Sequence, residues 1–133
     1  MRTLLRFLLA PTALAFLACG TGEGDSQQLD PTLSSIQSNI FSMRCHACHN
    51  EQSRDGNLDL SSDGVHDRLV GVKATADPEW TLVTPGEPEK SFLYVKITNP
   101  GQGQGDLMPP GFQLPQSEVD TIEQWITEGA ENN

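Results

Sequence analysis

The sequence has few of the residues that usually build a protein interior. Aromatic residues make up 6% and hydrophobic residues 36% of its 133 residues. This length suits one ordinary domain and is too short for two. Twelve glycines and nine prolines indicate long loops. A domain with so small a core folds more readily when a large apolar cofactor supplies part of the interior.

Basic residues are also scarce, with 8 Lys and Arg against 18 Asp and Glu, for a formal net charge of −10. This charge argues against binding to nucleic acid and against attraction to anionic lipid headgroups. It is compatible with redox partner proteins that present a basic docking patch, although solubility would explain it equally well. Internal repeats are absent.

No apolar run reaches the roughly 20 residues that cross a bilayer. The run Phe7–Ala18 follows Arg2 and Arg6 and is typical of the hydrophobic region of an export signal. We therefore expect residues 1–18 to be a signal peptide. Its loss would leave 6 basic against 18 acidic residues, a net charge of −12.

The residues around Cys19 are similar to a bacterial lipobox, in which the cysteine is lipidated and becomes the mature N-terminus. Phe16 and Leu17 depart from that pattern, and 13–15 (ALA) offers ordinary cleavage as the alternative. We expect lipidation at Cys19 and an exported protein of the periplasm or cell envelope, held to the membrane only by this anchor.

Residues 19–29 have almost nothing to bury and are predicted to be a flexible tether, followed by one domain at 30–133. Asp30 and Pro31 favour the start of a short helix that ends near Met43. Its apolar residues recur at spacings of three and four, namely Leu33, Ile36 and Ile40, with Phe41 beside them.

Three further helices are expected. Residues 63–70 suit two turns, residues 91–98 suit a helix opened by Pro88, and a final helix is predicted to be capped by Ser117. Its buried face would comprise Val119, Ile122, Trp125 and Ile126, and Gly129 would end it. An extended piece at 57–60, with Leu58 and Leu60 turned inward, and a glycine-rich loop at 99–105 complete the outline.

The first helix leads directly into Cys45-His46-Ala47-Cys48-His49, which has the Cys-x-x-Cys-His pattern of c-type haem attachment. The thiols of Cys45 and Cys48 can add to the two haem vinyl groups as thioethers. The adjacent His49 can then donate an imidazole nitrogen to the iron as an axial ligand.

Two other chemistries use the same residue types. A structural zinc site wants four nitrogen or sulfur ligands, and beyond the motif only His66 remains, with no second cysteine pair. A redox dithiol is expected beside a βαβ pattern, which is missing. Haem attachment is the favoured interpretation. A calcium loop at 55–66 is disfavoured, because Leu60 and His66 stand where glycine and glutamate are needed.

A low-spin electron carrier needs a second axial ligand, and methionine raises the potential of the iron. Met43 is too close to the attachment motif to reach the opposite haem face. Met108 follows the glycine-rich loop and precedes two prolines that restrict its backbone. We therefore predict Met108 as the ligand, with His66 as the alternative.

The chain resembles the class I cytochrome c family, particularly the small monohaem domains of exported bacterial lipoproteins. The resemblance rests on the Cys-x-x-Cys-His motif after a short helix, on 85–91 (PGEPEKS), on Met108-Pro109-Pro110 and on 125–130 (WITEGA). It covers residues 30–130. It implies an all-α fold of short helices and long loops wrapped round one covalent haem c, with the first and last helices crossing.

That family usually carries a proline soon after the attachment motif to support the proximal histidine. Residues 50–53 (NEQS) stand there instead, which leaves open which backbone carbonyl orients His49. The resemblance implies an extracytoplasmic single-electron carrier rather than an enzyme, with His/Met ligation and no nucleic-acid partner. The alternatives are a haem enzyme or ligand sensor with a dissociable Met108, and a zinc-stapled interaction module.

Overall fold

The computed structural model describes residues 28–133, and this part of the chain is built from short helices joined by loops. The segments are α1 (Leu33–Ile36), η1 (Gln37–Cys45), η2 (Asp55–Asn57), α2 (Val65–Leu69), η3 (Pro88–Lys90), α3 (Phe92–Thr98) and α4 (Gln116–Thr127). β-Contacts within residues 28–133 are limited to three isolated bridges. The predicted all-α, cytochrome c-like fold is confirmed. None of these helices is long and apolar enough to cross a membrane.

The first helix begins and ends later than the sequence indicated. Thr32, not Asp30, caps α1, and its hydroxyl accepts a hydrogen bond from the amide of Ser35 at 3.2 Å. The helix continues without a break into η1, a wider π-helical segment that ends at Cys45 rather than near Met43. π-Helical turns are rare and are often found at functional sites.

The last helix begins after Pro115, so the predicted capping by Ser117 is wrong. Pro115 makes no side-chain cap, and the carboxylate of Asp120 accepts a hydrogen bond from the Gln116 side chain instead. The predicted buried face is confirmed, since Val119, Ile122, Trp125 and Ile126 are all buried. The chain then turns at Gly129, whose φ of +108° suits a residue without a Cβ.

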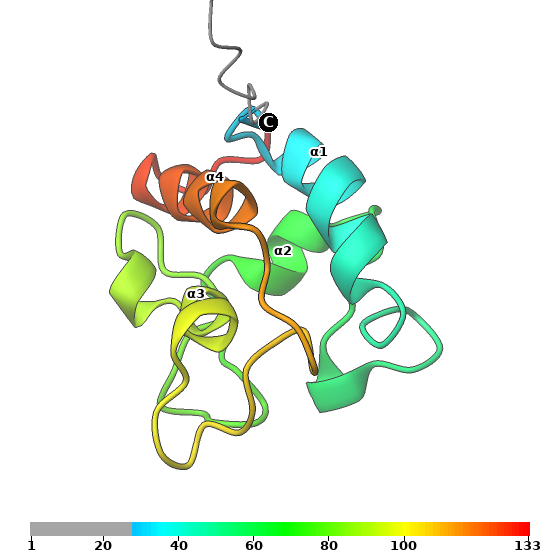
Figure 1. Ribbon diagram of the computed structural model, residues 1–133, viewed down its shortest axis with the longest axis vertical. Helices are drawn as coiled ribbons and strands as arrows, with labels where there is room; N and C mark the ends of the chain where they lie inside the picture. The colour runs from blue at the N-terminus through cyan, green and yellow to red at the C-terminus, as the bar shows by residue number, and fades with distance from the viewer. Residues whose placement is uncertain (1–27) are drawn as a thin grey trace, which may run out of the picture.

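The two ends of the domain meet where α1 contacts α4 (Figure 1). The amide of Ser34 donates to the backbone carbonyl of Asn133 at 2.9 Å, and the amide of Leu33 donates to its side chain at 2.9 Å. Further along, the Arg44 side chain at the end of η1 pairs with Glu118 in the first turn of α4 at 2.8 Å. The predicted packing of first helix on last helix is thus present.

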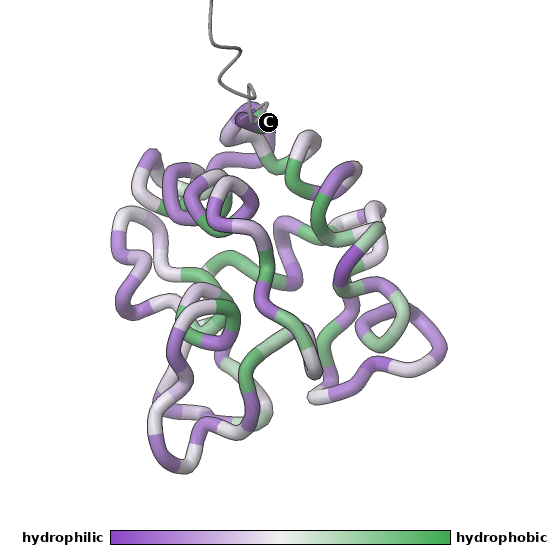
Figure 2. Tube along the Cα trace, viewed as in Figure 1, coloured by the Kyte–Doolittle hydropathy of each residue, from purple (hydrophilic) through white to green (hydrophobic). Residues whose placement is uncertain are grey.

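The core is formed mainly by these helices and by the segments that run between them. Hydrophobic residues gather in the helices and in the inner segments, whereas the outer loops are mostly hydrophilic or neutral (Figure 2). The buried cluster comprises Leu33, Ile36, Ile40, Phe41, Leu60, Val65, Leu69, Val83, Leu93, Ile97, Leu114, Val119, Ile122, Trp125, Ile126 and Ala130. Burial of this apolar surface is the main favourable term in folding.

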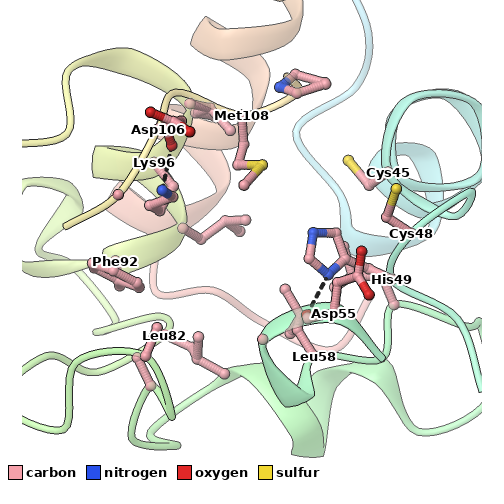
Figure 3. Close-up of a pocket in the computed structure, with 18 of the residues that line it drawn as sticks. Cys45, Cys48, His49, Asp55, Leu58, Leu82, Phe92, Lys96, Asp106 and Met108 are labelled. Carbon is pink, nitrogen blue, oxygen red and sulfur yellow. Dashed lines mark hydrogen bonds between the residues drawn. The ribbon is translucent and has the colours of Figure 1, made fainter. Parts of the chain in front are cut away.

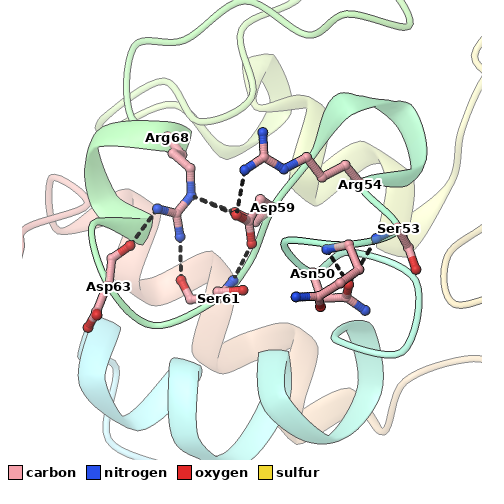
Figure 4. Close-up of polar contacts among 8 residues, drawn as sticks. Asn50, Ser53, Arg54, Asp59, Ser61, Asp63 and Arg68 are labelled. Carbon is pink, nitrogen blue, oxygen red and sulfur yellow. Dashed lines mark hydrogen bonds and ion pairs between the residues drawn. The ribbon is translucent and has the colours of Figure 1, made fainter.

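A polar cluster supports the segment between η2 and α2 (Figure 4). Leu60 is buried as predicted, but Asp59 is buried as well, with 6% of its surface exposed. Its carboxylate accepts a hydrogen bond from the amide of Ser61 at 2.9 Å and lies 3.7 Å and 4.0 Å from the guanidinium groups of Arg54 and Arg68. These contacts hold the pKa of Asp59 below its usual value, mainly through the Ser61 hydrogen bond.

Ser91 is the N-cap residue of α3 and links the segments before and after η3 by hydrogen bonds. Its hydroxyl is fully buried, accepts a hydrogen bond from the amide of Thr84 at 2.8 Å and lies 3.0 Å from the carbonyl of Glu87. The predicted helix over 91–98 is confirmed as α3. Helix α3 then leads through the glycine-rich loop back to Met108.

Candidate functional site

A cavity of about 330 Å³ lies between the attachment motif and the segment that carries Met108. Figure 3 shows the sulfur atoms of Cys45 and Cys48 at one edge, with the imidazole of His49 and the thioether of Met108 extending into the cavity. Most of the wall is apolar and includes Leu58, Leu60, Leu69, Ala74, Leu82, Phe92, Leu93, Ile97, Pro109 and Pro110. The structure therefore brings together four residues that the sequence predicted as one site.

The attachment motif forms a tight turn at the end of η1. The amides of Cys48 and His49 both donate to the carbonyl of Cys45, at 3.1 Å and 3.0 Å. The two-residue spacer thus places both thiols and the imidazole on one turn of chain. His46, within the spacer, is exposed.

The two thiols differ in their surroundings and are not joined by a disulfide. Cys48 is exposed and Cys45 is half-buried. Burial, assisted by the nearby Glu118 carboxylate, raises the pKa of the Cys45 thiol to about 11, because both disfavour the thiolate. The Cys45 thiol is therefore protonated at neutral pH.

His49 is oriented by the backbone carbonyl of Asp55, whose oxygen lies 2.9 Å from Nδ1. Since a carbonyl only accepts, this contact requires the proton on Nδ1 and leaves the lone pair on Nε2. The second ring nitrogen is then available to a metal, as is usual for histidine ligands fixed through their other nitrogen. The carbonyl that the sequence left unidentified is that of Asp55.

Asn50 organises the loop that delivers this carbonyl. Its side-chain oxygen accepts hydrogen bonds from the amides of Gln52 and Ser53, both at 2.9 Å, and its side-chain nitrogen donates to the carbonyl of His46 at 2.7 Å. Asparagine commonly stabilises turns in this way. Asn50 therefore stabilises the turn that follows the attachment motif.

Met108 is half-buried and is fixed through its backbone to α3, because its amide donates to the carbonyl of Lys96 at 2.7 Å. The peptide bond to Pro109 is cis. His66, the alternative ligand, does not line the cavity, and its Nε2 lies 3.0 Å from the carbonyl oxygen of Ala130. Met43 is 74% exposed and is not part of the cavity wall.

The residues of this cavity fit a c-type haem. An apolar wall suits the porphyrin face, and the thiols at one edge suit the vinyl groups. Imidazole and thioether are the pair of donors found on electron-carrier haem iron. Between residues 28 and 133, no group of three or more His, Cys, Asp or Glu is arranged to hold a metal ion.

Sequence reasoning missed several supporting residues around the cavity. Two of them, Asn50 and Lys96, donate side-chain hydrogen bonds to backbone carbonyls. Asp55 contributes its own backbone carbonyl, and Arg44 forms an ion pair with Glu118. An asparagine directly after the motif was a usable signal, because asparagine favours turns. The other contacts join residues far apart in sequence, and no local pattern announces them.

Comparison with protein families gives a match. The family model described as Planctomycete cytochrome C matches residues 45–111, which begin at Cys45 and include Met108. No curated protein and no solved structure matches the chain. The match covers 67 of the 133 residues and contains the whole attachment motif, and the chain therefore belongs to the Planctomycete cytochrome C family, a family of cytochrome c-like proteins.

Proposed function

We propose that this chain is an extracytoplasmic single-electron carrier that holds one haem c covalently through Cys45 and Cys48, with His49 and Met108 as axial ligands. The observation that carries the proposal is the apolar cavity into which these four side chains extend together. Membership of a cytochrome c-like family supports haem-based electron transfer.

Each residue has a separate task in this proposal. Cys45 and Cys48 anchor one edge of the cofactor, so it cannot leave an open site. His49 presents Nε2, because the Asp55 carbonyl holds its Nδ1. Met108 offers a soft thioether sulfur, and the leucines of the wall exclude water from the iron. When bound, the haem supplies an iron that gains or loses one electron.

The same residues argue for a carrier rather than an enzyme. With His49 and Met108 on the two axial positions, no coordination site is left for a substrate. Exposed Cys48 lies at one edge of the cavity, which suits electron transfer to a protein that docks briefly there. The net charge of −10 suits a partner with a basic docking patch.

The location of the protein is part of the proposal. The signal at 1–18, the lipid anchor at Cys19 and most of the tether at 19–29 lie outside the described residues. Export agrees with the chemistry, because c-type haem is attached after translocation. We propose a class I type domain over 30–133, held at the cell envelope by lipidated Cys19.

An absorption spectrum of the purified protein and of Met108→Ala tests this function. The wild type should show haem that survives acid–acetone extraction and a weak long-wavelength sulfur-to-iron band, and the substitution should abolish that band. Met43→Ala is the matched control and should keep it. Pigment lost on extraction would overturn covalent attachment, and a band that persists in Met108→Ala would remove Met108 from its role.

Carbon monoxide distinguishes the carrier from a haem enzyme or ligand sensor. A carrier with both axial positions filled should bind carbon monoxide only slowly in its reduced form. Rapid binding by the wild type, or peroxidase turnover, would favour the alternative in which Met108 dissociates.

A further inference from the structure

Lys96 in α3 contacts the loop over residues 99–107, which extends the glycine-rich loop by two residues, at two separate points. Its Nζ donates to the carbonyl of Gln104 at 2.9 Å and also to the carbonyl of Asp106. Its own carbonyl accepts the Met108 amide at 2.7 Å. One residue therefore contacts both the middle of the loop and its exit, and Figure 3 shows the contact with Asp106 at the exit.

The ammonium group of Lys96 is half-buried and lines the same cavity as Met108. A long, flexible lysine side chain normally keeps its charge in water. Here the charged ammonium group donates to two loop carbonyls. Hydrogen bonds from a charged donor are stronger than those between neutral groups. Within residues 28–133, Lys96 takes part in none of the ion pairs. Its side-chain hydrogen bonds go to the loop.

The absence of a side chain at Gly105 leaves room for this contact. Its φ is +77°, and a Cβ at this position would lie 3.3 Å from the Nζ of Lys96. Gly103 in the same loop has a φ of +89°, but a Cβ there would meet nothing within 4 Å. The loop thus needs glycine at both positions for its backbone, and at Gly105 also to let the ammonium group approach.

We propose that Lys96 is the positioning residue for Met108: it clamps the 99–107 loop through Gln104 and Asp106 and so keeps the Met108 sulfur in the cavity. This inference rests on the proposed function, since it concerns the ligand assigned there. It adds that this loop, which has three glycines, holds the methionine that follows it because a residue of α3 closes the loop.

The test compares matched pairs of variants of the haem-loaded protein. Lys96→Leu removes all donors and adds no second thioether to the cavity. Lys73→Leu is its control, because Lys73 also donates to a loop carbonyl, that of Glu79 at 3.1 Å, in a different loop. Gly105→Ala and Gly103→Ala form the second pair, and both place an alanine at a positive φ.

The readouts are the sulfur-to-iron band, followed with temperature, and the rate of carbon monoxide binding to the reduced protein. Loss of the charge-assisted contact between Lys96 and the loop corresponds to about a tenfold change in the fraction with Met108 dissociated. Lys96→Leu should therefore bind carbon monoxide about tenfold faster and lose the band well below the temperature of global unfolding. Gly105→Ala should shift both readouts in the same direction, and Lys73→Leu should match the wild type.

Gly103→Ala should shift the band much less than Gly105→Ala. Equal effects of the two alanine variants, or a Lys96→Leu protein with wild-type behaviour, would overturn the clamp. The Met108→Ala spectrum separates the ligand assignment from the clamp. A band that persists there overturns both, whereas a band lost there but unchanged in Lys96→Leu overturns the clamp alone.

Discussion

At the scale of single residues, several side chains act by fixing a backbone carbonyl rather than by touching a ligand. Asn50 shapes the turn after the motif, and the Asp55 carbonyl that follows sets the tautomer of His49. Arg54 and Asn57 take left-handed backbone angles on either side of this carbonyl, with φ of 45° and 59°. Such angles are uncommon in residues other than glycine, so this segment is held by its surroundings.

Asp59 should make stability depend on pH. Its folded pKa is lowered, chiefly by the hydrogen bond from Ser61. A lowered carboxyl pKa stabilises the folded protein above the unfolded value of about 3.9, and this contribution is lost as the pH falls through the folded value. Asp59→Asn should therefore be less stable than the wild type at pH 6, and the difference should shrink below pH ~4.

Urea unfolding at a series of pH values measures this difference. Asp63→Asn is the control, because Asp63 is exposed and contributes only its backbone carbonyl, to Arg68. A difference between wild type and Asp59→Asn that stays constant down to pH 2 would contradict the assignment.

At the scale of elements, the attachment motif is anchored by the contact between η1 and α4. Arg44, directly before Cys45, makes a two-pronged contact with Glu118, with Nε at 3.2 Å from both carboxylate oxygens and Nη2 at 2.8 Å from one. Glu118 also lies in the first turn of α4, where a negative charge is favourable. The ion pair therefore joins the site to the last helix.

A double-mutant cycle of Arg44→Gln and Glu118→Gln should give a favourable coupling free energy between the two side chains. Since Arg44 is partly exposed, salt screens the pair, and the coupling should fall when sodium chloride is raised from 0.05 to about 1 M. The control cycle uses the exposed ion pair between Glu87, the N-cap residue of η3, and Lys90 at the end of η3. We expect a smaller coupling free energy for this pair. Equal couplings in the two cycles would argue against an anchoring role.

Element boundaries differ from prediction for a local reason. The sequence offered Asp30 and Ser117 as caps, but the hydrogen bonds of the helix starts are made by Thr32 in α1 and by no side chain in α4. Several small polar residues stand near each start, and which one caps depends on where packing against the core begins the helix. The apolar spacing, in contrast, identified the buried faces correctly.

At the scale of the whole molecule, we expect the proposed haem to fill part of the interior. The apolar cavity wall contains leucines, Phe92 and Ile97, and only 36% of the sequence is hydrophobic. A ligand that binds only the folded state stabilises it by mass action, and a covalent one cannot dissociate. The chain without haem should therefore be much less stable.

The double variant Cys45→Ala, Cys48→Ala tests this dependence, because it removes both attachment points. It should lose near-ultraviolet circular dichroism and unfold without a sharp transition at a temperature where the wild type is folded. Cys19→Ala is the control and should match the wild type in both measurements. A double variant that unfolds as sharply as the wild type, at the same temperature, would contradict the prediction.

The chemistry proposed for the site came from the sequence alone, because Cys45, Cys48 and His49 stand within five consecutive residues and need only one turn of chain to act together. The sequence also determined the helical class, since apolar spacing reports which faces are buried. Only the tertiary structure decided what holds the site in place: the Asp55 carbonyl at His49, Glu118 at Arg44, and Lys96 at the Met108 loop. These contacts depend on how distant segments pack, and packing depends on the whole chain rather than on any local pattern.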